Sequence, residues 1–143
     1  DEAPEGSGGR SATSDRSDES AYDFYDDVGE RNYPSARRRL ERLLSDPDWP
    51  AVRLIIGLSV HFTRLGRARG LLDAGHSPQQ AAQQFDRTRL GEKFAKQARG
   101  WSAPAVQHAL RKLKEADRAI KTGTSDQQAL SLFLTQVVPR SHG

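Results

Sequence analysis

Apolar residues recur at intervals of three or four positions along most of this chain, which is the spacing of one face of an α-helix. Strict alternation of apolar and polar residues, which would indicate half-buried β-strands, does not occur in the sequence. The pattern therefore predicts an all-α fold, a single bundle of about six to seven helices joined by short loops. The predicted helices span about residues 20–29, 34–45, 49–74, 78–84, 88–99, 103–122 and 126–138.

Capping residues and prolines support these helix boundaries. Pro50 is expected in the first turn of the longest helix, and Gly75 is expected to end that helix in a left-handed conformation. Ser125 is followed by Gln128 at the spacing of a capping box. The predicted N-cap residues are Asp48, Ser77, Ser102 and Ser125.

The apolar faces of these helices define the predicted core. Trp49 and Trp101 follow loops at helix starts, and we expect them to anchor those loops to the core. The longest helix is expected to bury one stripe, made of Val52, Ile55, Ile56, Ser59, Phe62, Leu65, Gly66 and Leu72. The residues expected to form the structural core are Phe62, Leu65, Leu110, Leu113 and Phe133.

Residues 1–19 differ in composition from the rest of the chain, because they contain no apolar side chain larger than Ala or Pro. Such a segment cannot bury enough apolar surface to offset the entropy lost on ordering. We therefore predict a flexible acidic Gly/Ser-rich arm at 1–19, a helical domain at 20–138 and a C-terminal tail at 139–143. The net charge also differs between the two ends of the chain, because residues 1–30 carry a net charge of −8 and residues 31–143 carry a net charge of +11.

Residues that could carry out chemistry are few. The chain has no Cys, which excludes disulfides and thiolate metal sites and is typical of a cytoplasmic protein. No apolar run approaches the roughly 18 residues of a membrane span. We expect the isolated histidines His61, His76, His108 and His142 to be structural or solvated. Since no Gly-rich phosphate loop is present either, the sequence predicts no catalytic residue, no metal, no cofactor and no small-molecule substrate.

The charged residues leave two interpretations open. Asp23, Asp26 and Asp27 are expected to be exposed acids on a short helix rather than a catalytic pair. The cations either cover solvated helix faces or contact a nucleic-acid backbone or an acidic partner. Aromatic residues do not interleave with these cations, which disfavours recognition by base stacking. The candidate contact residues are Arg37, Arg38, Arg64, Arg67, Arg111 and Lys114.

The last third of the chain contains a more specific motif, Leu110-x-x-Leu113-x-x-Ala116-Asp117-x-x-Ile120-Lys121-Thr122-Gly123. It resembles the "L..AD..LKTG" helix end of the delta subunit of the bacterial DNA polymerase III clamp loader, with Ile120 in place of the second Leu. Asp117 is expected either to pair with Lys121 or to cap a neighbouring helix. Five segments resemble that family in the same order: 20–45, 51–76, 77–82, 93–102 and 105–138.

The resemblance covers about residues 20–138 and concerns only the C-terminal collar domain of the family. It implies a non-catalytic assembly role, in which the domain packs with gamma/tau-type and delta-prime-type collar domains during sliding-clamp loading in DNA replication. DNA would be contacted weakly or indirectly. The parent holoenzyme of that family is a DNA-directed DNA polymerase, a nucleotidyltransferase. From the residues alone, a stand-alone basic helical module that binds nucleic acid is the alternative.

Overall fold

The computed structural model describes residues 12–138, with side chains from Glu19 onward. Within that range the chain forms helices and no β-strand, which confirms the all-α prediction. The helices are α2 (Ala12–Gly29), α3 (Tyr33–Leu44), α4 (Ala51–Asp73), α5 (Pro78–Gln83), α6 (Thr88–Ala98), α7 (Ala103–Lys121) and α8 (Asp126–Val137).

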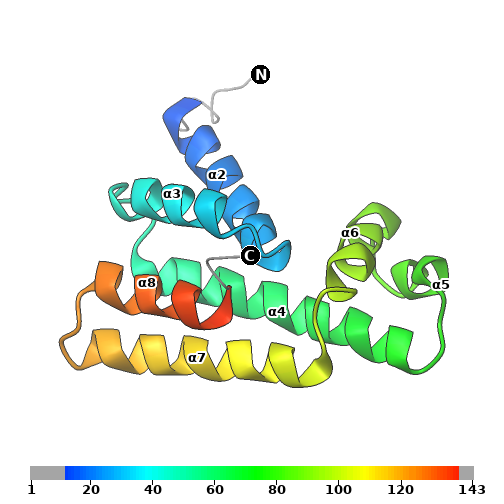
Figure 1. Ribbon diagram of the computed structural model, residues 1–143. Coiled ribbons are helices and arrows are strands. Elements are labelled where there is room, and N and C mark those ends of the chain that lie inside the picture. The colour runs from blue at the N-terminus through cyan, green and yellow to red at the C-terminus, as the bar shows by residue number, and fades with distance from the viewer. Residues whose placement is uncertain (1–11, 139–143) are drawn as a thin grey trace.

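The long helix α4 is central to the fold (Figure 1). Helix α7 runs antiparallel along α4, and α8 folds back beside α7. Helix α3 packs against α8, while α2 crosses α3 and also contacts α4. Helices α5 and α6 form a hairpin on the C-terminal half of α4. Each helix turns an apolar face toward its neighbours, so the core lies around α4 where these faces meet.

Aromatic side chains from separate helices meet at the centre of the core. Phe62 of α4 is fully buried. Its ring lies edge-on to the Trp101 ring, with 5.0 Å between centroids, and edge-on to the Phe133 ring at 6.4 Å. Leu65 and Leu113 are buried with them, in positions where the apolar pattern placed the core. These contacts hold α4, α7 and α8 together with the loop that precedes α7.

Trp101 connects that loop to the end of α2. Its indole N–H donates a hydrogen bond of 2.8 Å to the Gly29 carbonyl, and the ring is buried. The Arg31 guanidinium stacks over the same ring at 3.8 Å. Arg31 has a left-handed φ of 61°, which belongs to the tight turn between α2 and α3. The expectation that Trp101 anchors a loop to the core is confirmed.

Local capping determines several helix boundaries. The Ser77 hydroxyl accepts the Gln80 N–H at 3.1 Å, and the Gln80 side chain accepts the Ser77 N–H at 2.8 Å, which completes a capping box. The hydroxyls of Ser102 and Ser125 each accept an N–H from three residues further on. Gly75 has a φ of 101° just beyond α4, as predicted for a left-handed helix end.

Helix α2 begins earlier than predicted. It starts at Ala12, so the predicted boundary between a flexible arm and a helical domain at residue 20 falls inside a helix. Periodicity could not indicate this start, because residues 12–19 contain no large apolar side chain. The rest of the predicted arm, residues 1–11, and the predicted tail, 139–143, lie outside the described residues.

The start of α4 also differs from the prediction. Pro50 occupies the N-cap position and no side chain caps the helix, so the prediction of Asp48 as N-cap is wrong. Asp48 belongs to the preceding turn, where its N–H donates to the Asp46 carboxylate at 2.9 Å. Its carbonyl accepts a hydrogen bond of 2.8 Å from the Arg53 guanidinium. Asp48 therefore lies two residues before the N-cap position, in the turn that leads into α4.

Candidate functional site

Helix α4 presents an apolar ridge to solvent, formed by Val52, Ile56 and Val60. The exposed fractions of these side chains are 50%, 60% and 44%, and their spacing of four residues places them on one face. The prediction that Val52 and Ile56 are buried is wrong. Helix α7 packs along one side of this ridge, and α2 and α6 pack along the other, so the strip between them stays uncovered.

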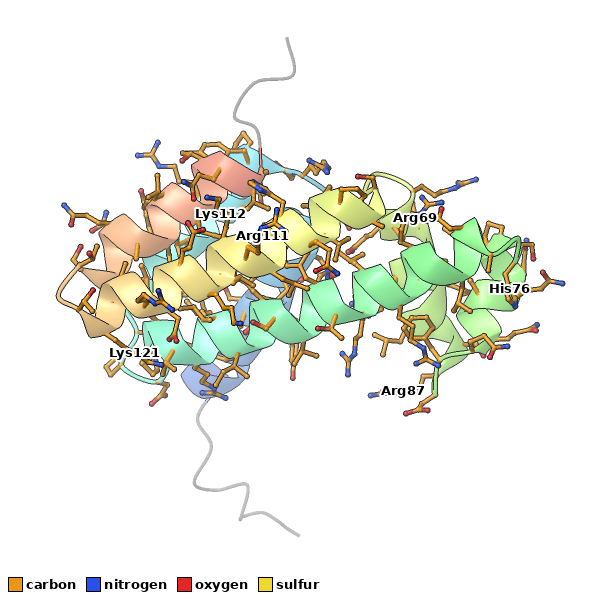
Figure 2. The ribbon with its side chains drawn as sticks, turned by 90° about the horizontal axis from the view of Figure 1, so that it is seen from below. Arg69, His76, Arg87, Arg111, Lys112 and Lys121 are labelled. Carbon is orange, nitrogen blue, oxygen red and sulfur yellow. The ribbon has the colours of Figure 1, made fainter. Side chains whose placement is uncertain are left out.

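On one side of the ridge, α4 and α7 enclose a groove of about 680 Å³, named here the α4–α7 groove. Its walls are mostly apolar, and the cations of α7 form its rim. Figure 2 shows Arg111 and Lys121 on α7, which runs beside α4 in this view. Besides the three ridge residues, the main lining residues are Ile55, Leu110, Leu113, Arg111, Lys114 and Lys121.

Leu110 and Asp117 of α7 both line this groove, one as part of its apolar wall and the other as a partner of Lys121. Leu110 was predicted as a core residue, but it is only partly buried because it forms part of the groove wall. The Asp117 carboxylate accepts a hydrogen bond of 2.7 Å from the Lys121 ammonium, which is one of the two roles expected for it. Across residues 12–138, Arg111 and Lys114 form no ion pair, so they are the uncompensated cations of this rim.

On the other side of the ridge, α2, α4 and α6 enclose a groove of about 500 Å³, named here the α2–α4–α6 groove. Tyr25 crosses its floor, and a Cβ at Gly57 would lie 2.0 Å from the Tyr25 hydroxyl oxygen. Burial raises the pKa of Tyr25 to about 12. The charged lining residues are Asp26, Arg53, Arg64, Arg87 and Lys93.

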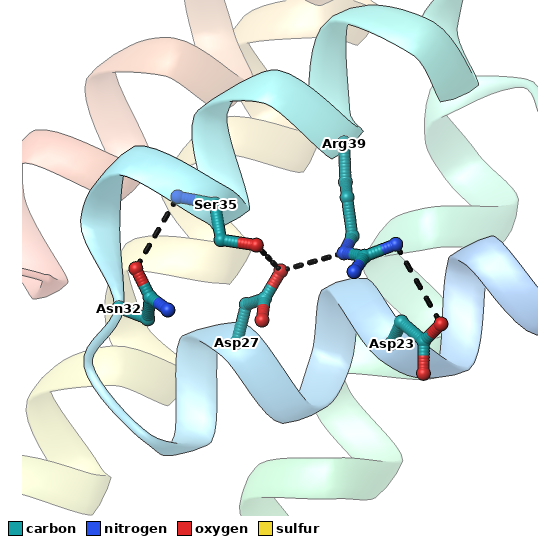
Figure 3. A network of polar contacts seen from close by, with 5 residues as sticks. All are labelled: Asp23, Asp27, Asn32, Ser35 and Arg39. Carbon is teal, nitrogen blue, oxygen red and sulfur yellow. Dashed lines mark hydrogen bonds and ion pairs between the residues drawn. The ribbon is translucent and has the colours of Figure 1, made fainter.

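The acids of α2 are not the exposed group that the sequence suggested. Figure 3 shows the Asp27 side chain extending from α2 toward α3, where one of its oxygens accepts from the Ser35 hydroxyl at 2.6 Å and from the Arg39 guanidinium at 2.8 Å. Asp27 is buried, which corrects the prediction for this residue. Asp23 is exposed and lies 3.5 Å from Arg39. These bonds join α2 to α3 and are structural.

His61 belongs to a second polar network, which lies between α4, α6 and α2. Its Nε2 is 2.8 Å from the Gln97 side-chain oxygen, so the Nε2–H tautomer of the ring donates this bond. The Gln97 amide nitrogen donates to Asp26 at 3.1 Å, and Lys93 pairs with Asp26 at 3.3 Å. Burial lowers the pKa of His61 to about 4, although the Gln97 hydrogen bond and the Asp26 charge oppose the shift.

We expect the free energy of unfolding to fall as pH decreases from about 6.5 to about 4, because the unfolded chain protonates His61 first. The stability due to the neutral imidazole is complete above the unfolded pKa of 6.5 and is lost as pH approaches the folded pKa. The shift corresponds to roughly 3 kcal/mol. Urea unfolding of the wild type and of His61→Gln at about pH 7 and about pH 4.5 measures it. The pH dependence should be smaller in the variant; an unchanged dependence would contradict the assignment.

The six candidate contact residues do not form one surface. Arg37 and Arg38 are exposed on α3, where Arg37 lies 3.4 Å from Glu41 of the same helix. Arg111 and Lys114 lie together on the rim of the α4–α7 groove. The α3 pair and the α7 pair therefore lie on different helices, and of the two only the α7 pair lines the α4–α7 groove.

The remaining two candidates lie on α4. Arg64 lines the α2–α4–α6 groove, with its guanidinium 5.9 Å from the centroid of the Phe94 ring. Arg67 donates a hydrogen bond to the Gln84 carbonyl and lies 4.7 Å over the Phe85 ring, so it ties α4 to the end of α5. Arg67 is thus occupied by a structural contact.

Sequence reasoning missed several residues of the two grooves. Arg53, Arg87 and Lys93 were not singled out, and neither was Tyr22, which is 66% exposed. Tyr22 and Arg87 are far apart in the sequence, and only the packing of α2 and α6 against α4 brings them to one groove. No local pattern in the sequence could indicate this proximity.

The two grooves and the ridge between them are the candidate binding surfaces of the described residues. Within it, no group of three or more His, Asp or Glu residues is placed to hold a metal ion. None of the helices between residues 12 and 138 is long and apolar enough to cross a membrane. An apolar ridge between two grooves with basic rims can bind apolar and acidic side chains of another molecule.

A comparison with protein families matches residues 18–137 to the family described as DNA polymerase III delta subunit, C-terminal domain. The chain belongs to this family. The match extends from α2 to α8 and confirms the resemblance found at the helix end before Gly123. A comparison with curated proteins gave no match.

Among solved structures, this delta-family chain is similar to the Bacillus subtilis DNA clamp loader delta protein (YqeN), with a TM-score of 0.66 and 22% sequence identity. The aligned region covers 85% of this chain and 36% of that chain. At this level of identity the likeness shows a shared fold. The delta-family chain described here thus spans about a third of the length of the Bacillus subtilis protein.

Proposed function

We propose that this chain is the non-catalytic assembly domain of a clamp-loader delta subunit. In this role it packs with collar domains of other clamp-loader subunits, of the gamma/tau and delta-prime types, during sliding-clamp loading in DNA replication. Membership of the delta C-terminal domain family supports the role. The fold shared with a Bacillus subtilis protein that is described as a clamp loader delta protein also supports it.

The observation that carries the proposal is the apolar ridge of α4, formed by Val52, Ile56 and Val60. A contiguous exposed apolar strip bounded by polar residues is typical of a protein–protein contact. The ridge adjoins the α4–α7 groove, so a neighbouring helix could bury the ridge and fill the groove together. Arg111 and Lys114 lie where the polar rim of such an interface would be, and Arg is enriched at interfaces.

Replacing the ridge residues should weaken assembly strongly while leaving the fold intact. Ile56→Asp combined with Val60→Asp should weaken binding to partner clamp-loader subunits about thirtyfold or more, because losing a central apolar contact costs about 2 kcal/mol or more. Co-purification and quantitative binding with partner subunits of the same organism measure the effect. Partner subunits from which the collar domains have been removed should not bind.

Leu132→Asp is the matched control, because Leu132 is 57% exposed but lies on α8 and lines neither groove. It should retain binding, and circular dichroism should show the helical content of the wild type in all variants. If Leu132→Asp weakened binding as much as the ridge variant, the interface would lie elsewhere. If the chain ignored partner collars but held DNA tightly at high salt, the basic nucleic-acid-binding module would replace the proposal.

A further inference from the structure

The α2–α4–α6 groove lies across the ridge from the groove used above, with which it shares Ile56 and Val60. Its lining is strongly unbalanced in charge. It contains one acid and four cations, and the acid, Asp26, is already paired with Lys93. The other cations that line the groove are Arg53, Arg64 and Arg87, and the inference below rests on Arg64 and Arg87.

Two of these three guanidinium groups lie over aromatic rings. Arg53 stacks 3.8 Å over the Trp49 ring, and Arg64 lies 5.9 Å from the centroid of the Phe94 ring. Arg87 occupies the N-cap position of α6 and is exposed. Within the described chain, neither Arg64 nor Arg87 forms an ion pair. Two uncompensated guanidinium groups therefore border one groove.

The floor between these cations is apolar. Ile56 and Val60 of the ridge form one wall, and Leu90 of α6 forms part of the opposite wall. Tyr22 of α2 contributes an exposed ring, held edge-on to the Tyr25 ring with 6.2 Å between centroids. An apolar floor bordered by arginines suits a ligand that combines an apolar side chain with carboxylates, because a guanidinium binds a carboxylate through two parallel hydrogen bonds.

We infer that the α2–α4–α6 groove binds an acidic peptide segment of a partner protein. One apolar or aromatic side chain of the segment would sit against Ile56, Val60 and Leu90, and flanking carboxylates would pair with Arg64 and Arg87. This site shares Ile56 and Val60 with the collar contact proposed above, but it lies on the other side of the ridge and uses different cations. Its occupant is defined by chemistry: a short run of Asp or Glu residues interrupted by one large apolar residue.

A single-stranded nucleic acid fits the groove less well. Such strands bind to successive exposed aromatic rings on which the bases stack. Here Tyr22 is the exposed ring, whereas Tyr25, Trp49 and Phe94 are buried. These buried rings and aliphatic side chains line the groove, which can accommodate one apolar side chain but offers no series of exposed rings for stacked bases.

Fluorescence polarisation with a labelled short peptide, in which one Phe is flanked by aspartates, tests the inference on the 143-residue chain. Arg64→Glu combined with Arg87→Glu should weaken binding about tenfold or more. Arg37→Glu combined with Arg38→Glu makes the same charge change on α3, and Arg111→Glu combined with Lys114→Glu makes it in the other groove. Both control variants should bind the peptide within about twofold of the wild type.

Two further probes distinguish the chemistry. A peptide with Ser in place of the Phe should bind at least about tenfold more weakly, whereas oligothymidylate of the same charge should bind more weakly than the acidic peptide. Equal losses in the control variants, equal binding of the Ser peptide, or tighter binding of oligothymidylate would each overturn the inference.

Because the Arg64 and Lys93 charges help to lower the pKa of His61, bound acidic peptide should raise that pKa in NMR titrations. An unchanged His61 pKa would place the peptide elsewhere.

Discussion

Phe62→Ala should lower the free energy of unfolding by about 3–5 kcal/mol. Phe62 is fully buried, and its ring contacts the Trp101 and Phe133 rings edge-on. Truncation to Ala removes the apolar contacts of the ring and leaves a cavity among helices that cannot collapse freely. The loss should appear as a lower urea midpoint with an unchanged dependence on urea concentration.

Val60→Ala is the control for this prediction, because Val60 lies on the same helix but is 44% exposed. Its effect on the free energy of unfolding should stay within about 0.5 kcal/mol. If Phe62→Ala cost less than roughly 1 kcal/mol, the ring would not be part of the cooperative core.

Gly91→Ala should destabilise the chain by about 1–3 kcal/mol or more, because the α5–α6 hairpin has no room for a side chain there. A Cβ at Gly91 would lie 2.2 Å from the Ala82 carbonyl oxygen, which is a backbone atom and cannot rotate away. Helix α6 would have to move away from the end of α5, which would disturb the contacts of Phe85 and Phe94. Thermal and urea unfolding measure the loss.

Gly70→Ala makes the same chemical change where there is space. Gly70 lies in α4, and apart from its chain neighbours and the backbone of its own helix no heavy atom lies within 4 Å of the position that a Cβ would take. Alanine there should stabilise the chain by about 0.5–1 kcal/mol, since it reduces the entropy of the unfolded state and favours the helix. Opposite signs for the two variants would support the packing described for α5 and α6. A stabilising effect of Gly91→Ala would contradict it.

Local signals in the sequence predicted most of the helices and their ends. Ser77, Ser102 and Ser125 act as caps through hydrogen bonds to residues three positions away, and Gly75 ends α4 through its own backbone angle. Such interactions lie within a few residues of the signal, so a sequence pattern can contain them. The start of α2 at Ala12 was missed because residues 12–19 contain no large apolar side chain whose spacing would indicate a helical face.

Family membership also followed from the sequence, because the helix-end motif before Gly123 and its order with the other segments are properties of the chain itself. The family match over residues 18–137 confirms that interpretation. The contacts made by the surface arginines did not follow from the sequence in the same way. Arg67 stays a predicted contact residue, but the sequence did not indicate the hydrogen bond that its guanidinium donates to the Gln84 carbonyl.

Only the tertiary structure decided which apolar residues are buried and which charges meet. Ile56 and Phe62 both belong to the apolar stripe predicted for α4, but α7 and α8 cover Phe62, whereas none of the helices between residues 12 and 138 covers Ile56. Asp27 is buried because α3 brings Arg39 to it. The sequence by itself determined the helices, their caps and the family. Burial and the two grooves depend on contacts between segments that are distant in the sequence. The hydrogen bond from Gln97 to Asp26, for example, joins residues 71 positions apart. A helical period describes only one helix at a time, so it cannot predict such contacts.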